Sequence, residues 1–407
     1  MKLNPKYILE ECDTVMKSER SDLIKFFYDK YMTKEEIMYR LPLELNIDDF
    51  WTEELEYRRS GARVLPLHFY DGKAYMYNRT AEFIRSADVI TSMARNTSDT
   101  SVFADLGDGS LIDEAYYSSI IEGAFSTREK AHALVESGRE PSDKDERMIL
   151  NNYNALRFVL DNLDYPVTEN LIIRIGQILT EGTDESIQGY RDDNVYVMSH
   201  TGKVIYTAPD PQYIKDMMSE LVDYINDPEI HPVERAVIAH VFFVTIHPFF
   251  DGNGRTARAL TYMILLKAGY DFFKYMPISG ILSEERGRYY KAIRASQNEA
   301  NGYDLTYFTN YYSSLLAKTV RSVGSRLKVM DRLSKLKALL DPEKDVRLIK
   351  GAVWLATEDV AVITAEKWRN KFGVSFETAR KDLMKLTELG FLKRRVDGHK
   401  VSYSIDM

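Results

Sequence analysis

Apolar residues recur three and four positions apart along most of the chain. This spacing predicts amphipathic helices, and it is clearest in four segments, Leu150–Leu163, Leu171–Leu179, Met217–Ile225 and Ala236–Ile246. A further helical pattern runs from Tyr307 to about Leu340. We therefore expect a mainly α-helical fold.

Short extended segments interrupt the helical pattern in two places. Val195–Ser199 and Lys203–Thr207 flank a His-Thr-Gly turn, which predicts a β-hairpin inserted between helices. The residues from Arg63 to Met76 are also extended and are broken by Asp71 and Gly72. The sequence assigns no chemistry to the first hundred residues.

The composition bounds the class of protein. The chain has 407 residues, 44% of them hydrophobic, which is enough for two or three domains with buried cores. Its one cysteine, Cys12, excludes an internal disulfide and a cysteine-based metal site. We find neither a secretory signal nor an apolar run long enough to cross a bilayer, so we expect a cytoplasmic protein without membrane contact. The net charge of -8 argues against a chain that coats nucleic acid throughout.

The segment from His247 to Arg258 carries the candidate chemistry. It precedes a helical pattern, Thr256–Ala268, and therefore predicts a loop at a helix N-terminus. Gly252, Asn253 and Gly254 tolerate the dihedral angles that turn backbone N–H groups toward an anion, and the helix dipole adds to that field. This combination favours a phosphate-binding site.

Four side chains complete this segment. Arg255 and Arg258 lie one turn apart on the expected helix and so point to the same side, where two guanidinium groups could hold adjacent phosphates. Asp251 offers a carboxylate for a magnesium ion that bridges phosphates, and His247 can accept a proton near neutral pH. Each feature alone is also compatible with an ordinary turn or a solvated helix face, but together they have the order that phosphate transfer requires.

The segment resembles the signature of the Fic family, His-x-Phe-x-(Asp/Glu)-Gly-Asn-Gly-Arg-x-x-Arg. It matches every specified position, with His247, Phe249, Asp251, Gly252, Asn253, Gly254, Arg255 and Arg258. The resemblance extends roughly from Ile112 to Leu315 and includes Gly189, Tyr190 and Arg191 and the helix that contains His240.

The resemblance implies an activity and a role for each matched residue. Most Fic proteins are helical enzymes that transfer AMP from ATP to a Ser, Thr or Tyr hydroxyl of a target protein. By position, His247 would be the base, Asp251 would hold Mg²⁺, and Gly252–Gly254 would hold the α and β phosphates. Arg255 would bind toward the β phosphate and Arg258 would hold the γ phosphate. The implied partners are ATP and a protein substrate, with self-modification included.

The resemblance also assigns roles around the loop. Phe249 would anchor the loop in the core. The hairpin, with Val204, Ile205 and Tyr206, would be a flap on which a target segment adds as a strand; a purely structural hairpin is the alternative. The pair Tyr289 and Tyr290, in a helix expected from Leu282 to Ser296, would lie near the base or ribose.

The nucleotide base itself is left open. An Asn that some relatives carry before the aromatic pair is replaced here by Glu285. Some relatives use UTP or CDP-choline, and one branch phosphorylates its target with ATP. The intact Gly-Asn-Gly-Arg-x-x-Arg favours a nucleoside triphosphate and AMP transfer.

A second motif, Ser118-Ser-Ile-Ile-Glu122-Gly123, is similar to the family's inhibitory pattern, (Ser/Thr)-x-x-x-Glu-(Gly/Asn). Ser118 and Glu122 would share a helix face, and Gly123 would end the helix. A carboxylate at Glu122 can pair bidentately with Arg258 and occupy the arginine that the γ phosphate needs. The resemblance therefore implies an autoinhibited enzyme. The carboxylate could also position water for the removal of AMP, and homo-oligomerisation could control the inhibitory helix.

The C-terminal residues predict a winged helix-turn-helix. A helix from Ala365 to Phe372 precedes Ser375, a plausible N-cap of a second helix that ends at Gly390, and a hairpin follows with its turn at Asp397. Residues 345–407 carry twelve Lys and Arg against nine Asp and Glu, a net charge of +3 in a chain of -8. The module could dock a protein, or it could bind DNA through its basic residues. Those residues are Arg380, Lys381, Lys393, Arg394, Arg395 and Lys400.

We thus predict an N-terminal region (1–105), a Fic-type helical core (106–320) with its inhibitory helix at 112–123, a helical linker (321–345) and a winged helix-turn-helix (346–407). The leading hypothesis is an autoinhibited protein AMP-transferase. The competing hypothesis is a DNA-binding regulator in which the Fic portion senses ATP or modifies only itself.

Overall fold

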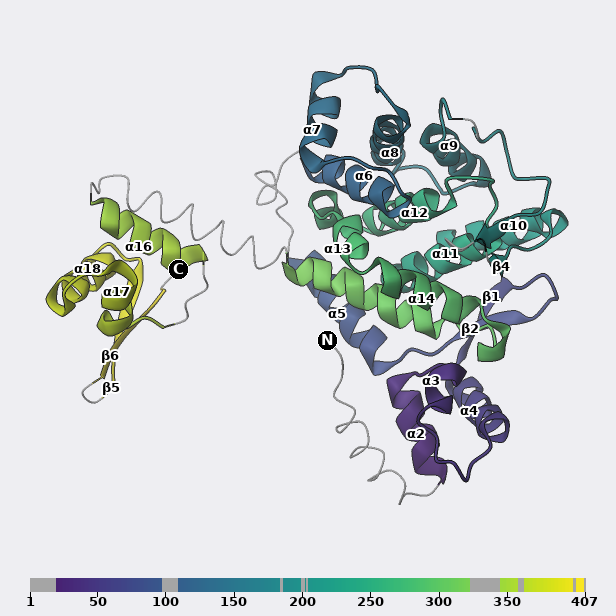
Figure 1. Cartoon of the computed structure of the whole chain (residues 1–407), viewed down its shortest axis with the longest axis horizontal. Helices are drawn as coiled ribbons and strands as arrows, with labels where there is room; N and C mark the ends of the chain where they lie inside the picture. Colours follow the sequence, from purple (N-terminus) through teal and green to yellow (C-terminus); the bar gives the residue numbers. More distant parts are fainter. Residues whose placement is uncertain are drawn as a thin grey trace. The chain divides into compact units, whose positions relative to one another are not determined.

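The computed structural model describes residues 20–96, 109–183, 186–198, 202, 204–322, 345–357, 362–397 and 400–405. The fold is mainly α-helical, as predicted, and carries three two-stranded antiparallel sheets in the described residues. The chain divides into two compact units (Figure 1). One contains residues 1–100 and 104–320, and the other contains residues 101–103 and 321–407.

Two buried helices form the centre of the first unit. The sequence of α11 (Pro232–Ile246) is apolar on every side, and all its residues except Pro232 and Arg235 are buried. It packs against α12 (Asn253–Lys267), which is also buried over most of its length. Figure 1 shows α12 between α11 and the helices α6, α8 and α9. A helix that is apolar all round is expected in the middle of a domain.

The remaining helices of the core surround this pair. They are α6 (Gly109–Ile121), α7 (Arg128–Ser137), α8 (Lys144–Asp161), α9 (Glu169–Leu179), α10 (Ile214–Asn226), α13 (Ile278–Glu284), α14 (Arg286–Gln297) and a helix over 306–322, with 3-10 turns at Pro211–Tyr213, Asp271–Tyr275 and Glu299–Asn301. The four helices that the apolar periodicity predicts are all present, in α8, α9, α10 and α11. The expected helix from Leu282 to Ser296 is instead two helices that break at Glu285.

The N-terminal region packs on the core within the same unit. It contains α2 (Arg20–Lys30), α3 (Lys34–Met38), α4 (Ile47–Gly61), α5 (Ala81–Asn96) and the hairpin of β1 (Arg63–His68) and β2 (Ala74–Tyr77). Arg58 of α4 is fully buried and donates to Glu54, to the backbone of Met32 and to the hydroxyl of Tyr307 in the core. Trp51 donates to the carbonyl of Ala300 at 2.6 Å. These contacts fasten α4 to the core.

A second hairpin lies where the sequence predicts the flap. Its strands are β3 (Tyr196–Met198) and β4 (Val204–Thr207), which pair antiparallel with Val197 opposite Tyr206. The predicted strand ends Ser199 and Lys203 and most of the turn lie outside the described residues.

The second unit is a winged helix-turn-helix, as predicted. It contains α16 (Val346–Thr357), α17 (Ala365–Phe372), α18 (Phe376–Glu388) and the wing of β5 (Leu392–Asp397) and β6 (Lys400–Ile405). Ser375 caps α18 by accepting from the backbone N–H of Thr378. The core includes Trp368, Leu383 and Leu386. Most of the predicted linker at 321–345 lies outside the described residues.

Candidate active site

The loop between α11 and α12 begins at a left-handed residue. His247 ends α11 with φ 52° and ψ 57°, an unusual conformation for a residue other than glycine. Gly252 has φ 79° and precedes α12 without a side-chain cap. The first N–H groups of α12, from Asn253 onward, therefore have no partner within their helix and can face an anion.

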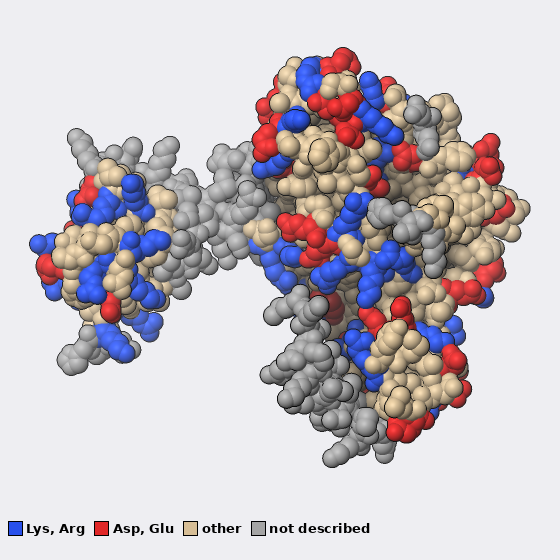
Figure 2. Space-filling view, in the orientation of Figure 1, with Lys and Arg blue, Asp and Glu red and all other residues tan. Residues whose placement is uncertain are grey.

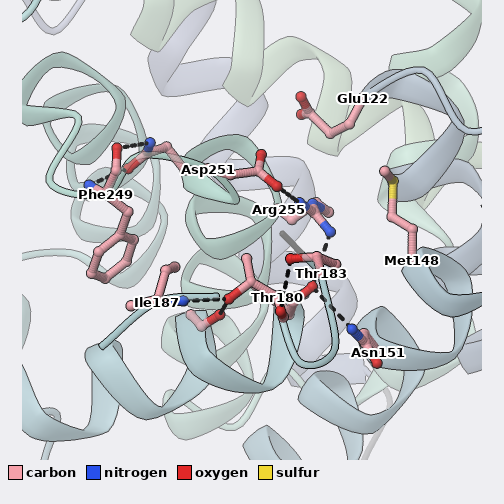
Figure 3. A network of polar contacts seen from close by, with 12 residues as sticks. Glu122, Met148, Asn151, Thr180, Thr183, Ile187, Phe249, Asp251 and Arg255 are labelled. Carbon is pink, nitrogen blue, oxygen red and sulfur yellow. Dashed lines mark hydrogen bonds and ion pairs between the residues drawn. The ribbon is translucent and has the colours of Figure 1, made fainter. Parts of the chain in front are cut away.

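Asn253 and Phe249 hold the loop in shape. The backbone N–H of Phe249 donates to Oδ1 of Asn253 at 3.0 Å, and Nδ2 of Asn253 donates back to the carbonyl of Phe249 at 2.8 Å (Figure 3). The ring of Phe249 is fully buried against Gly176, where an added Cβ would lie 2.9 Å from it. This is the anchoring position expected for Phe249. The side chain of Asn253 thus holds the loop itself.

His247 has the protonation expected of a general base. Its Nδ1 lies 3.3 Å from the carbonyl of Val244. A carbonyl only accepts, so Nδ1 carries the proton and Nε2 is left as the acceptor. Burial lowers the pKa of His247, and Arg191 lowers it further, whereas the contact with Val244 and the carboxylates of Glu122 and Asp251 raise it. The net lowering keeps the imidazole neutral at neutral pH.

Arg191 positions both the loop and the flap, and its role was missed from the sequence. It is 3% exposed, and its Nε donates to the carbonyl of His247 at 2.8 Å. Its other nitrogens donate to the carbonyls of Asp193, before β3, and Pro209, after β4. Its backbone N–H donates to Pro248 at 2.9 Å. One buried guanidinium therefore connects the histidine to both ends of the hairpin.

The spacing predicts that the two arginines of α12 point to the same side, but Arg255 bonds the end of α9 and Arg258 bonds α6. Arg255 is 1% exposed and donates to the carbonyl of Leu179 at 3.0 Å and to Asp251 at 2.8 Å (Figure 3). Arg258 is directed toward α6. Nε of Arg255 and Nη1 of Arg258 are buried and have no hydrogen-bond partner in the described part of the chain. Both nitrogens are donors that an anion could satisfy.

Arg258 contacts the motif Ser118–Gly123 at the end of α6. Its Nε donates to Oγ of Ser118 at 2.8 Å, and its Nη2 donates to the Ser118 carbonyl at 2.9 Å and to Oε1 of Glu122 at 2.8 Å. The pairing with Glu122 is therefore a single contact. The bidentate pairing that we expected is wrong, because Nε of Arg258 already donates to Ser118. Gly123 ends the helix with φ 101°.

Gly254 makes room for this carboxylate. A Cβ at position 254 would lie 2.2 Å from Oε1 of Glu122 and 3.3 Å from Nη1 of Arg258. Burial lowers the pKa of Arg258, but Glu122, Tyr289 and Tyr290 together outweigh burial, and the pKa lies above its usual range. The loop, Arg258 and Glu122 thus meet at one point.

A cleft of about 350 Å³ opens over His247. Its lining combines the end of the motif Ser118–Gly123, the loop, the flap and α14: Glu122, His247, Gly254, Val197, Met198, Ile205, Tyr206, Arg286, Tyr290 and Arg294. Tyr206 is fastened to α11 by a 2.8 Å hydrogen bond to the carbonyl of Thr245. Val204 and Ile205 are 46% and 39% exposed. Of the predicted flap residues, Ile205 and Tyr206 therefore line the cleft, whereas Val204 does not.

The aromatic pair of α14 divides into two environments. Tyr289 is 1% exposed and its hydroxyl lies 2.8 Å from Nε2 of His240. His240 is buried, and its Nδ1 lies 2.9 Å from Oγ1 of Thr261. Tyr289 therefore presents only its ring to the cleft, while Tyr290 is half-buried under the guanidinium of Arg286 at 5.7 Å.

Asp251 has the chemistry of a magnesium ligand. The described residues contain no group of three or more metal-ligating side chains. Asp251 is 44% exposed at the N-terminus of α12, and Arg255 holds only its Oδ2. Mg²⁺ is commonly bound by one or two carboxylates together with substrate phosphates and water. A single accessible carboxylate beside the loop Gly252–Gly254 fits that pattern.

Comparison with known proteins identifies this region. Residues 166–265 match the model of the Fic/DOC family. They form a Fic domain. The match contains the flap, the loop and α12 up to Leu265, whereas the motif Ser118–Gly123 precedes it. Residues 360–404 match the DeoR-like helix-turn-helix domain.

Curated relatives align with about half of the chain. A stretch of 215 residues is 31% identical to the protein adenylyltransferase Fic of Nematostella vectensis, over 50% of this chain and 47% of that protein. A stretch of 209 residues is 32% identical to the protein adenylyltransferase fic-1 of Caenorhabditis elegans, over 48% of this chain and 38% of that protein. The chain thus spans less than half the length of these relatives.

A solved structure supports the fold. The crystal structure of a Fic family protein from Desulfovibrio desulfuricans G20 superposes with a TM-score of 0.55 at 19% identity, over 81% of this chain and 97% of that one. At this identity the similarity concerns the fold alone. No helix among the described residues is long and apolar enough to cross a membrane.

Proposed function

We propose that the chain transfers AMP from ATP to the hydroxyl of a Ser, Thr or Tyr side chain of a protein, itself included. The observation that carries this proposal is a neutral His247 beside a helix N-terminus at which two buried arginine nitrogens lack partners among the described residues. Relatives named protein adenylyltransferase, aligned over about half of the chain, support the same reaction.

The proposed reaction gives each group of the site a role. The triphosphate lies on the N–H groups of Gly252–Gly254, with Arg255 toward the β phosphate and Arg258 toward the γ phosphate. The target hydroxyl loses its proton to Nε2 of His247 as its oxygen bonds to the α phosphorus. The bond from that phosphorus to the bridging oxygen breaks, and pyrophosphate leaves. Asp251 would hold Mg²⁺, which neutralises phosphate charge when bound.

We further propose that Glu122 inhibits this reaction. Its carboxylate occupies Nη2 of Arg258, a donor that the γ phosphate needs, and lies against Gly254. The helix that ends just before Glu122 is held to α13, because the buried Glu114 of α6 accepts from the backbone N–H of Ser279 at 2.8 Å. A negative charge at this point repels the triphosphate or displaces its terminal phosphate.

Labelled ATP tests the donor chemistry. The Glu122→Gly chain is incubated with magnesium and ATP labelled at the α or at the γ phosphorus, and incorporation into the chain is measured. Incorporation of the α label alone is expected. Incorporation of the γ label alone would show phosphoryl transfer and would overturn the proposed reaction.

A second candidate function belongs to the C-terminal unit, and its match to a DeoR-like helix-turn-helix favours it. The wing carries Lys393, Arg394 and Arg395, which are exposed, and Arg380 and Lys381 are exposed on α18. These cations suit contacts with DNA phosphates.

The same helix also exposes Phe376 and Met384, 53% and 42%, which suits a protein partner as well. Binding to a labelled DNA duplex at several salt concentrations distinguishes a DNA partner from a protein partner. DNA binding predicts an affinity that falls steeply with salt and weakens when Arg394 and Arg395 are both replaced by Gln. The absence of binding at low salt would exclude this function.

A further inference from the structure

Helix α14 carries a concentration of positive charge in an acidic protein. Its sequence contains Arg286, Arg288, Lys291 and Arg294 and no acidic residue, whereas the whole chain has a net charge of -8. Figure 2 shows Lys and Arg side chains gathered over this part of the surface. Like charges on one helix repel one another, so a cluster of this kind is typical of a surface that meets an anionic partner.

Arg294 differs from most of its neighbours because it has no ion pair among the described residues and is exposed. Arg286 lies over the ring of Tyr290. The other cations have carboxylate partners: Arg288 with Glu285, Lys291 with Glu36, and Lys34 with Asp48. Arg294 is therefore available to an incoming carboxylate.

Arg294 also lies where two clefts meet. It lines the cleft over His247 and, in addition, a second cleft of about 580 Å³ between α14 and the N-terminal region. The second cleft is lined by Thr33, Lys34, Met38, Lys291, Arg294 and Asn301, with Glu35 as its one carboxylate. A polypeptide that leaves His247 along α14 would pass Arg294 and enter this second cleft.

We propose that the second cleft binds an acidic segment of the target protein, with a carboxylate of that segment paired to Arg294. The inference rests on the proposed function, since it concerns the polypeptide whose hydroxyl reaches His247. Lys34 and Lys291 already pair with Asp48 and Glu36, so Arg294 is the cation of the described lining that remains open to this carboxylate. The N-terminal region contributes the opposite wall of the cleft, through α3.

A polypeptide fits this path better than a nucleic acid. The flap is a two-stranded sheet in which β4 pairs with β3 alone among the described strands, so an extended polypeptide can add to its free edge. The described lining of the second cleft contains no aromatic side chain on which a base could stack. Charge and shape therefore both indicate an acidic peptide.

Peptide binding tests the proposal. The probes are two short fluorescein-labelled peptides with a central threonine, one with glutamate and the other with glutamine at the flanking positions. Anisotropy titrations use the full chain with Glu122→Gly at low salt. The glutamate peptide is expected to bind more tightly, and Arg294→Gln is expected to weaken it about fivefold while leaving the glutamine peptide unchanged. High salt should remove the difference.

Arg288→Gln is the matched control, because Arg288 lies on the same helix, is paired with Glu285 and lines neither cleft. It is expected to leave both affinities unchanged. Equal binding of the two peptides, no measurable binding of either, or equal weakening in the two arginine variants would overturn the proposal. Binding needs no AMP transfer, so a failure of the proposed reaction would appear separately, as absent α label with peptide binding intact.

Discussion

Arg191→Lys tests whether one buried side chain positions the base and the flap together. The substitution keeps the positive charge but replaces a fork of donors by a single ammonium group. That group cannot reach the carbonyls of His247, Asp193 and Pro209 at once, since they lie on different segments. Arg191 is 3% exposed, so water cannot readily replace the missing donors.

The structure sets the size of the effect. A hydrogen bond from a charged group contributes about 1.5–3 kcal/mol, and effects within one network are not additive. Because the one ammonium group of lysine cannot replace all four side-chain hydrogen bonds of Arg191, we expect the free energy of unfolding to fall by about 2–4 kcal/mol. A displacement of His247 by about 1 Å would lower the transfer rate about 100-fold. The KM for ATP should change little, because Arg191 does not contact the Gly252–Gly254 loop.

The assay measures label transfer and thermal unfolding in the Glu122→Gly background. Arg174→Lys is the control, since Arg174 is exposed on α9 and bonds only Gln177 among the described residues. A rate near that of the parent, from a folded Arg191→Lys chain, would refute the positioning role. An effect confined to the KM for ATP would refute it as well.

Two further predictions concern the site and its support. Because the pKa of His247 lies below its usual value, transfer should persist on acidification until the pH falls through that lowered pKa, and then be lost as the base protonates. A pH–rate profile of the Glu122→Gly chain checks this, and an acidic limb above about pH 6.5 would contradict it. Tyr289→Phe leaves buried His240 without its Nε2 partner and should lower the free energy of unfolding by about 1–2 kcal/mol with little change in the KM for ATP. Tyr290→Ala should instead raise the KM for ATP. Denaturant unfolding and kinetic assays check both variants: a raised KM in Tyr289→Phe with an unchanged KM in Tyr290→Ala would refute the different roles of the two tyrosines.

Local pattern predicts much of this fold. Apolar periodicity identified the central helices, and glycine with extended segments identified the flap, because both signals depend on residues close in sequence. The break at Glu285 was missed, since the apolar spacing of α13 and α14 continues across it. The wing and Ser375 cap were predicted correctly for the same local reason.

The supports of the site depend on contacts between distant segments. The hydroxyl of Tyr289 meets His240 across 49 positions, and Arg58 fastens the N-terminal region to Tyr307 across 249. The sequence does not distinguish Arg191 from an exposed loop arginine, because its burial is known only from the structure. The single contact between Glu122 and Arg258 follows from the competing bonds of Ser118. Such partners arise from packing, which periodicity does not encode.

The most direct test of the account compares transfer of the α label from ATP, with magnesium, by four chains. They are the unsubstituted chain, Glu122→Gly, Glu122→Gly with His247→Ala, and the control Glu140→Gly in the exposed turn before α8. The account predicts strong labelling in Glu122→Gly alone. Equal labelling of the unsubstituted chain would contradict the inhibition, and labelling that survives His247→Ala would contradict the base.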